Sequence, residues 1–148
     1  MQEAYQYKHI LAAVDMTENN KKVIAKAVDR ARANNAKLSV IHVDVDLKDL
    51  YTEMIDIDID NIQDKVVADA TDRLREYIGE IDYPIEKKLV ICGDLALKVN
   101  EAVDQYGIDL LVCGHEQSFW SILASSARQL MNTVPCDLLV IPLPKNKR

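Results

Sequence analysis

Short apolar runs alternate along this chain with longer stretches whose apolar residues recur every three or four positions. The runs cover residues 8–14, 37–43, 85–91, 110–113 and 138–141, and each has the length of a β-strand. The stretches between them have helical spacing and carry capping residues, among them Thr17, Asp94 and Gly107. This alternation predicts an α/β fold with a parallel sheet, helices on both faces and right-handed crossovers.

The length of 148 residues predicts a single domain, residues 1–148, with one solid core. No apolar run approaches the ~20 residues that span a bilayer. The first nine residues are polar and lack the apolar core of a signal peptide. We therefore expect a cytoplasmic protein that does not bind membranes.

The net charge of −6 argues against nucleic acid or an anionic membrane surface as a partner. The excess is local, because residues 44–60 hold seven acidic residues and one lysine. This segment includes Asp56, Asp58 and Asp60, which begin like a calcium-binding loop. Asn61 stands where that loop needs glycine, and Val67 where it needs glutamate. We interpret the segment as a solvated acidic face or a helix cap.

Neither the histidines nor the cysteines have the spacing of a metal site. His9, His42 and His115 are isolated from one another in the sequence. The three cysteines, Cys92, Cys113 and Cys136, show no CxxC spacing and lie in or beside apolar runs. We expect no bound metal and three buried, reduced thiols.

The segment after residues 110–113 has the position of a ligand site without the chemistry of a phosphate site. Ligands of open α/β sheets bind at the carboxyl ends of strands, where backbone N–H groups and helix dipoles converge. Between Gly114 and Ala127 there is no lysine or arginine, and Glu116 adds negative charge. The first strand-to-helix turn, residues 15–20, has no glycine, which excludes a dinucleotide turn and a P-loop. Ser125 and Ser126 fit phosphate contacts or phosphorylation targets and, equally, small residues that pack a helix on the sheet.

Several short motifs, in order and spacing, resemble those of the A-type universal stress proteins. They include DLLVCGH at 109–115, FWS at 119–121, SSARQ at 125–129 and DLLVIPL at 137–143, with further matches at residues 7–15, 36–45, 49–51 and 93–95. The resemblance therefore covers nearly the whole chain.

The resemblance implies a Rossmann-like, adenine-nucleotide α-hydrolase-like fold with five parallel strands in the order 3-2-1-4-5. It also implies a homodimer through the last strand, which is apolar on both faces and lies at the sheet's edge in that order. A two-fold contact between two such edges closes the assembly. The expected interface residues are Leu138, Leu139, Val140, Ile141 and Pro142.

ATP-binding members of that family carry a Gly-x2-Gly-x9-Gly-Ser/Thr signature at the ligand site. This chain keeps Gly114, has Gln117 for the second glycine, and has Ser125 and Ser126 where the Gly-Ser pair should be. The positions similar to the adenine and ribose contacts, Asp15 and Val43, remain. The resemblance is therefore to the branch that does not bind ATP, with a vestigial pocket and no cofactor.

The function that this resemblance implies is that of a non-enzymatic stress protein. It is expected to be a cytoplasmic Ser/Thr phosphoprotein that acts through an unknown protein partner. Its implied role is survival of growth arrest and of DNA-damaging or oxidative stress. A nucleotide-binding switch with a degenerate pocket is the alternative. A hydrolase or transferase is a third hypothesis, against which the sequence offers no positioned nucleophile with a base and no metal ligand set.

Overall fold

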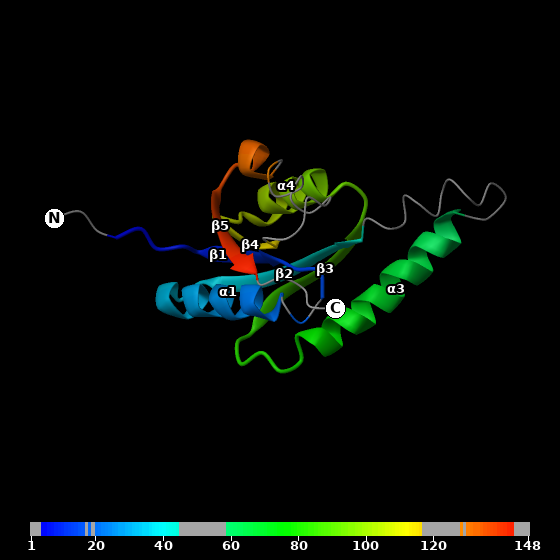
Figure 1. The fold of residues 1–148 in the computed structure, drawn as a ribbon, viewed down its shortest axis with the longest axis horizontal. Helices are drawn as coiled ribbons and strands as arrows, with labels where there is room; N and C mark the ends of the chain where they lie inside the picture. The colour runs from blue at the N-terminus through cyan, green and yellow to red at the C-terminus, as the bar shows by residue number, and fades with distance from the viewer. Residues whose placement is uncertain are drawn as a thin grey trace.

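Five parallel strands form one sheet in the order β3-β2-β1-β4-β5, as the family resemblance implied (Figure 1). The computed structural model describes residues 4–16, 18, 20–44, 59–116, 128 and 130–143, without the side chains of residues 44, 59–66, 92 and 116. The strands are β1 (His9–Ala13), β2 (Lys37–Asp44), β3 (Ile85–Cys92), β4 (Leu110–Glu116) and β5 (Asp137–Leu143). The expected α/β architecture is confirmed.

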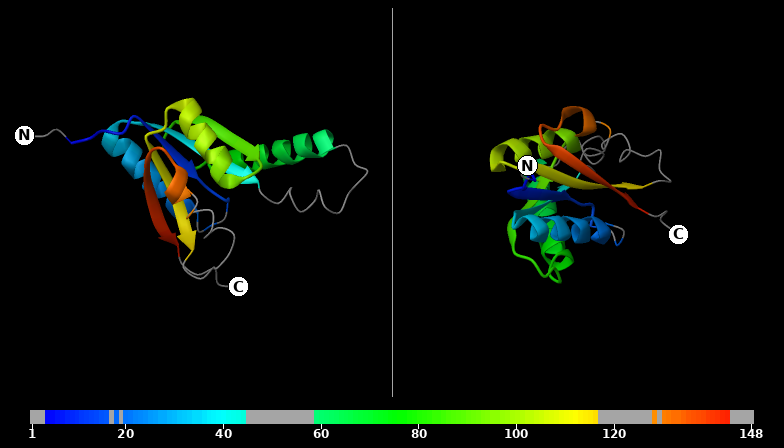
Figure 2. Two further views of the ribbon diagram at one scale, coloured as in Figure 1. Left: turned by 90° about the horizontal axis from the view of Figure 1, so that it is seen from above. Right: turned by 90° about the vertical axis from the view of Figure 1, so that its left-hand side faces the viewer.

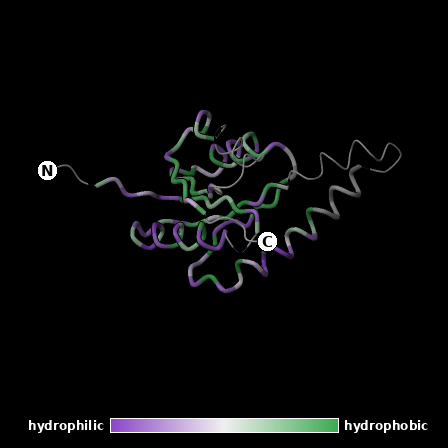
Figure 3. Tube along the Cα trace, viewed as in Figure 1, coloured by the Kyte–Doolittle hydropathy of each residue, from purple (hydrophilic) through white to green (hydrophobic). Residues whose placement is uncertain are grey.

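Helices cover both faces of the sheet (Figures 1 and 2). The helices α1 (Lys21–Asn34) and α3 (Ile59–Tyr77) lie on one face, and α4 (Leu95–Tyr106) lies on the other. Residues 128 and 130–133 are also helical, and Leu130 packs on the α4 face. The apolar residues gather along the strands and the inward sides of these helices, while polar residues face outward (Figure 3).

The two faces of each strand bury different cores. On β1, Ile10 and Ala12 pack with α1 and α3, whereas Leu11 packs with α4. All three side chains are fully buried. A central strand of a parallel sheet is covered on both sides, so it consists of a continuous apolar run rather than an alternating one.

Helix α4 begins and ends at the predicted capping residues. The Asp94 carboxylate accepts a hydrogen bond from the Leu97 N–H at 3.0 Å. Gly107 closes the helix in the left-handed conformation, with φ of 65°. Both residues satisfy backbone groups that the helix itself leaves unpaired.

Two strand ends and one helix start differ from the sequence-based expectation. The strand predicted at 110–113 continues through Gly114 to Glu116, because these residues pair in register with Ile141, Pro142 and Leu143 of β5. The expected end of this strand at Cys113 was therefore wrong, as was the expected end of the last strand at Ile141. Helix α1 begins at Lys21 after Asn20, so the predicted cap at Thr17 was also wrong.

No helix among the described residues is long and apolar enough to cross a membrane.

Candidate functional site

The carboxyl ends of three neighbouring strands carry the predicted pocket residues that the structure describes. Asp15 follows β1, Val43 lies near the end of β2, and Gly114 lies on β4. β1 pairs with both β2 and β4, so these three positions lie close together where the carboxyl ends of the strands meet. Gln117, Ser125 and Ser126, the other predicted pocket residues, lie outside the described residues.

Gly114 has no room for a side chain. A Cβ atom there would lie 2.6 Å from Leu143 Cδ1 and 3.1 Å from Val23 Cγ2. Leu143 is 2% exposed, and both neighbours belong to the core beneath α1. Close packing thus favours glycine at this position, since a larger residue would displace Leu143. The glycine retained from the ATP signature has a structural explanation that involves no phosphate.

Val43 faces the opposite side of the sheet from that packing. Its side chain is buried with Leu111 and Val99 in the core beneath α4. A hydrogen bond of 3.0 Å from the Val14 N–H to the Ile41 carbonyl ties the end of β1 to β2 beside it. Asp15 and Val43 therefore lie on adjacent strands. The Val43 side chain, however, lies on the face covered by α4, whereas the atoms packed around Gly114 lie on the face covered by α1.

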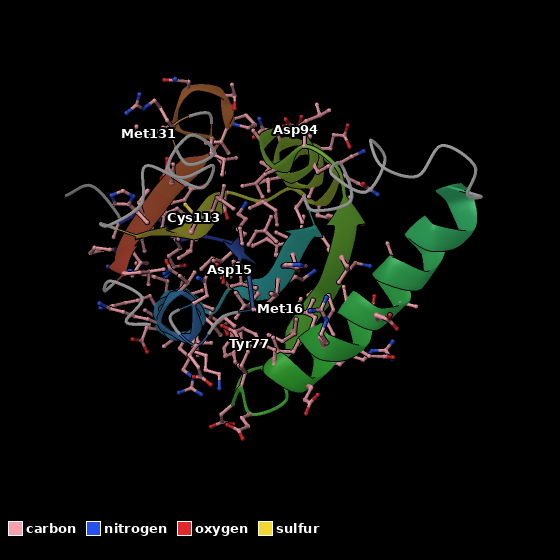
Figure 4. All side chains as sticks on the ribbon, turned by 45° about the vertical axis from the view of Figure 1, so that its right-hand side comes forward. Asp15, Met16, Tyr77, Asp94, Cys113 and Met131 are labelled. Carbon is pink, nitrogen blue, oxygen red and sulfur yellow. The ribbon has the colours of Figure 1, made fainter. Side chains whose placement is uncertain are left out.

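The turn after Asp15 takes an unusual backbone conformation. Met16 has φ of 65°, a left-handed value that is uncommon for residues other than glycine. The Asp15 N–H donates to the Asn20 side-chain oxygen at 3.4 Å. Asp15, Met16 and Tyr77 are labelled in Figure 4, and Met16 and Tyr77 pack against the α1 and α3 core. Burial, together with the negative charges of Asp15 and Glu18, raises the pKa of the Tyr77 phenol.

A second polar cluster lies at the other end of the sheet, where the strands begin. Asp109 accepts hydrogen bonds from the backbone N–H groups of Lys8 at 2.9 Å and His9 at 3.0 Å. The Tyr5 hydroxyl donates to the same carboxylate at 3.1 Å. Burial opposes the ionisation of Asp109, but these donors outweigh it and hold its pKa below the ordinary value. The cluster fixes the segment before β1 to the start of β4.

His9 and Ser39 continue this cluster into the core. The His9 Nδ1 lies 3.1 Å from the Tyr106 carbonyl, so it carries the proton, and Nε2 accepts from the Ser39 hydroxyl at 2.7 Å. Ser39 Oγ accepts in turn from the Lys87 N–H at 3.1 Å, where the register of β2 and β3 shifts. Burial lowers the pKa of His9. No local sequence pattern indicates this cluster, because its members are far apart in the chain.

The described residues of this chain contain no group of three His, Cys, Asp or Glu side chains placed to hold a metal ion. Cys113 is buried and Cys136 half-buried, and both are unpaired. Burial raises the pKa of each of these thiols to about 11. The side chain of Cys92 lies outside the described part of the chain.

The predicted interface residues lie on the edge strand β5. Leu138, Leu139 and Val140 are half-buried, and Pro142 is exposed. Ile141 is only 5% exposed and belongs to the core beneath α1. Among the described residues, Val140 packs into neither core cluster.

Comparison with known proteins gives one consistent result. Residues 6–142 match the model of the universal stress protein family. The chain is 48% identical to a universal stress protein A homolog of Haemophilus influenzae, over 93% of this chain and 97% of the relative. It is 47% identical to universal stress protein A of Escherichia coli, over 93% and 95% of the two chains.

Solved structures match the fold at lower sequence identity. A universal stress protein from Lactobacillus plantarum superposes with a TM-score of 0.67 at 21% identity, covering 93% of this chain and 99% of that chain. A universal stress protein solved in complex with cAMP superposes with a TM-score of 0.59 at 16% identity, covering 93% and 98%.

Proposed function

The chain belongs to the universal stress protein family, and on that premise we propose that it is a non-enzymatic stress-response protein that acts as a homodimer without binding ATP. Its relatives at 47–48% identity carry the name universal stress protein A, which supports the stress role. The proposal places the protein in the cytoplasm and includes survival of growth arrest and of DNA-damaging or oxidative stress. It also includes phosphorylation on serine or threonine.

The packing of Gly114 supports the absence of ATP binding most directly. Glycine at a phosphate site leaves space for the backbone to approach the phosphate oxygens. Here Leu143 and Val23 occupy the space beside the α-carbon. A triphosphate loses its hydration on binding and needs N–H groups or cations in exchange. Hydrocarbon atoms supply neither.

Isothermal titration calorimetry with ATP and Mg²⁺ tests this part of the proposal. We expect no binding at physiological nucleotide concentrations. A dissociation constant below about 100 µM, roughly −5.5 kcal/mol, would contradict it. An assay for nucleotide turnover on the same samples tests the hydrolase hypothesis, for which we expect no product above the protein-free rate.

A nucleotide-binding switch remains the second candidate because Asp15 and Val43 lie on adjacent strands at the ligand end of the sheet. A universal stress protein with this fold has been solved in complex with cAMP, which supports an adenine nucleotide as the ligand of such a switch. The melting temperature, measured with cAMP, with adenosine and without ligand, distinguishes the nucleotide-binding switch from the non-binding protein. A rise in Tm that disappears in the Asp15→Asn variant would favour the switch over the non-binding protein.

The edge position of β5 supports the homodimer. An edge strand offers unpaired N–H and C=O groups to a second chain. Leu138, Leu139 and Val140 are only half-buried in the single chain. Pairing of two β5 strands about a two-fold axis covers both β5 edges at once and closes the assembly as a dimer.

A further inference from the structure

The outer surface of α1 carries charge of the opposite sign to the whole chain. The net charge of the protein is −6, yet α1 contains five cations and one acid, Asp29. The five cations, all exposed, are Lys21, Lys22, Lys26, Arg30 and Arg32. This excess divides between the two flanks of the helix.

The flank of α1 that faces α3 is paired with partners from other elements. Lys21 Nζ lies 3.1 Å from a Glu18 carboxylate oxygen and 5.8 Å from the centre of the Tyr77 ring. Arg32 lies 3.3 Å from the Asp82 carboxylate, in the turn before β3. These contacts account for the two cations on this side of the helix.

The flank that faces β5 forms no ion pair with a described residue. Lys22, Lys26 and Arg30 follow one another at four-residue intervals, and we call them the cation row. Lys22 Nζ donates to the Pro142 carbonyl at 3.4 Å, and Arg30 lines a groove beside Leu139. Lys22 therefore lies near the end of β5 and Arg30 near its start. Helix α1 packs against the sheet on the β5 side (Figure 2). None of the ion pairs among the described residues includes a row cation.

Like charges at four-residue spacing repel one another and destabilise a helix. Asp29 also lies on α1, but it forms no ion pair within 4.0 Å with a described residue. The row thus presents three cations that pair with no carboxylate in the described part of a chain with an excess of acids. An arrangement of this kind is complementary to an acidic surface.

A groove with both apolar and polar walls opens where the row reaches the start of β5. Its volume is about 440 Å³, and its walls are Tyr7, Arg30, Leu110, Asp137, Leu138 and Leu139. Arg30 is the cation among these walls and Asp137 is the anion, and the Asp137 carboxylate accepts a hydrogen bond from the Tyr7 hydroxyl at 2.8 Å. The groove can take one apolar side chain beside a negatively charged group.

We propose that the cation row and this groove together bind an extended acidic segment of another protein. An apolar side chain enters the groove, and carboxylates at alternate residues lie along the row. The spacing fits, because residues four apart on a helix rise by ~6 Å and alternate residues of a strand by ~6.7 Å. Nucleic acid is disfavoured, since three cations on a chain of net charge −6 neutralise few phosphates.

A labelled peptide tests the proposal with the full-length protein. The probe is a fluorescein-labelled peptide with one leucine followed by alternating Glu and Thr, and its matched form has Gln in place of Glu. Fluorescence anisotropy should show binding of the Glu peptide at low salt that weakens as salt increases. The Gln peptide should bind at least tenfold more weakly. Failure of the Glu peptide to bind at low salt overturns the proposal.

Two matched variants separate the cation row from general charge effects. The row variant is Lys22→Gln/Lys26→Gln/Arg30→Gln, and the control variant is Lys8→Gln/Lys37→Gln/Lys88→Gln, which removes the same charge from other exposed positions. We expect the row variant to bind the peptide about tenfold more weakly and the control variant to bind as the unmodified protein does. Circular dichroism checks that both variants are folded. An equal loss in both variants overturns the proposal.

Crosslinking of the unmodified protein gives a result that does not depend on variants. A carbodiimide joins carboxylates of the bound peptide to nearby lysines, and mass spectrometry locates them. Crosslinks to Lys22 and Lys26 support the proposal, whereas crosslinks only elsewhere overturn it. A single-stranded oligonucleotide that binds tighter than the peptide and depends on the same row would reassign the surface to nucleic acid.

Discussion

At the scale of single residues, Gly114 shows how one position can have both a structural and a functional explanation. We expect Gly114→Ala to lower the free energy of unfolding by about 1–3 kcal/mol, because the new methyl group overpacks a filled core. The contact responsible is Leu143 Cδ1, 2.6 Å from the position of that methyl group. Chemical denaturation of the variant and the parent protein measures the difference.

A double-mutant cycle identifies the cause of that loss. Leu143→Val removes the Cδ1 atom that the alanine meets, so the combined variant should be less destabilised than the sum of the two single changes. Residues in contact show coupling of about 0.5–3 kcal/mol. Strict additivity would mean that Leu143 is not what excludes a side chain at this position.

At the scale of elements, the buried His9 ties β1, β2, β3 and α4 together in its neutral form. Because burial lowers the pKa of His9, the unfolded chain binds more protons below the ordinary pKa of 6.5. The free energy of unfolding should therefore fall as the pH decreases from about 7. For a single proton the slope is at most about 1.4 kcal/mol per pH unit.

Urea denaturation between pH 7.5 and 5 measures this dependence. The His9→Gln variant keeps a donor and an acceptor but does not titrate, so its stability should be lower at pH 7.5 and change less with pH. His115→Gln, at an exposed position on β4, is the matched control and should follow the unmodified protein. An identical pH dependence in all three proteins would assign the effect to other groups.

The sequence predicted the elements better than their ends and contacts. The apolar runs located all five strands, and Asp94 and Gly107 marked the ends of α4 because capping is a local interaction. The continuation of β4 through Gly114 depends on pairing with Ile141 to Leu143, which lie nearly thirty residues later. The left-handed Met16 and the His9–Ser39 hydrogen bond likewise depend on tertiary packing that no local pattern records.

At the scale of the whole molecule, Val140 offers the cleanest test of the proposed homodimer. We expect Val140→Lys to raise the dimer dissociation constant by at least about 100-fold, or about 2.8 kcal/mol, because it places an unpaired charge in an apolar contact. Ile141 is unsuitable for this purpose, because it is buried within the single chain and a lysine there would unfold it.

Sedimentation velocity at micromolar concentration gives the result. The unmodified protein should sediment as a dimer and the Val140→Lys variant as a folded monomer. Ala33→Lys, which adds the same charge at an exposed position on α1, should remain a dimer. A monomeric unmodified protein, or a dimeric Val140→Lys variant, would rule out pairing through β5.

The strand order also has a consequence for the chain while it is being made. β1 is synthesised first but lies at the centre of the sheet, between β2 and β4. During translation β2 can pair with it early, whereas β4 emerges only after some hundred residues. Until then the fully buried run Ile10–Ala12 forms an open apolar edge of a partial sheet, the kind of surface that drives nascent chains to aggregate. The ribosome-bound chain therefore passes through a stage in which the strand that will lie at the centre of the sheet is its least protected one.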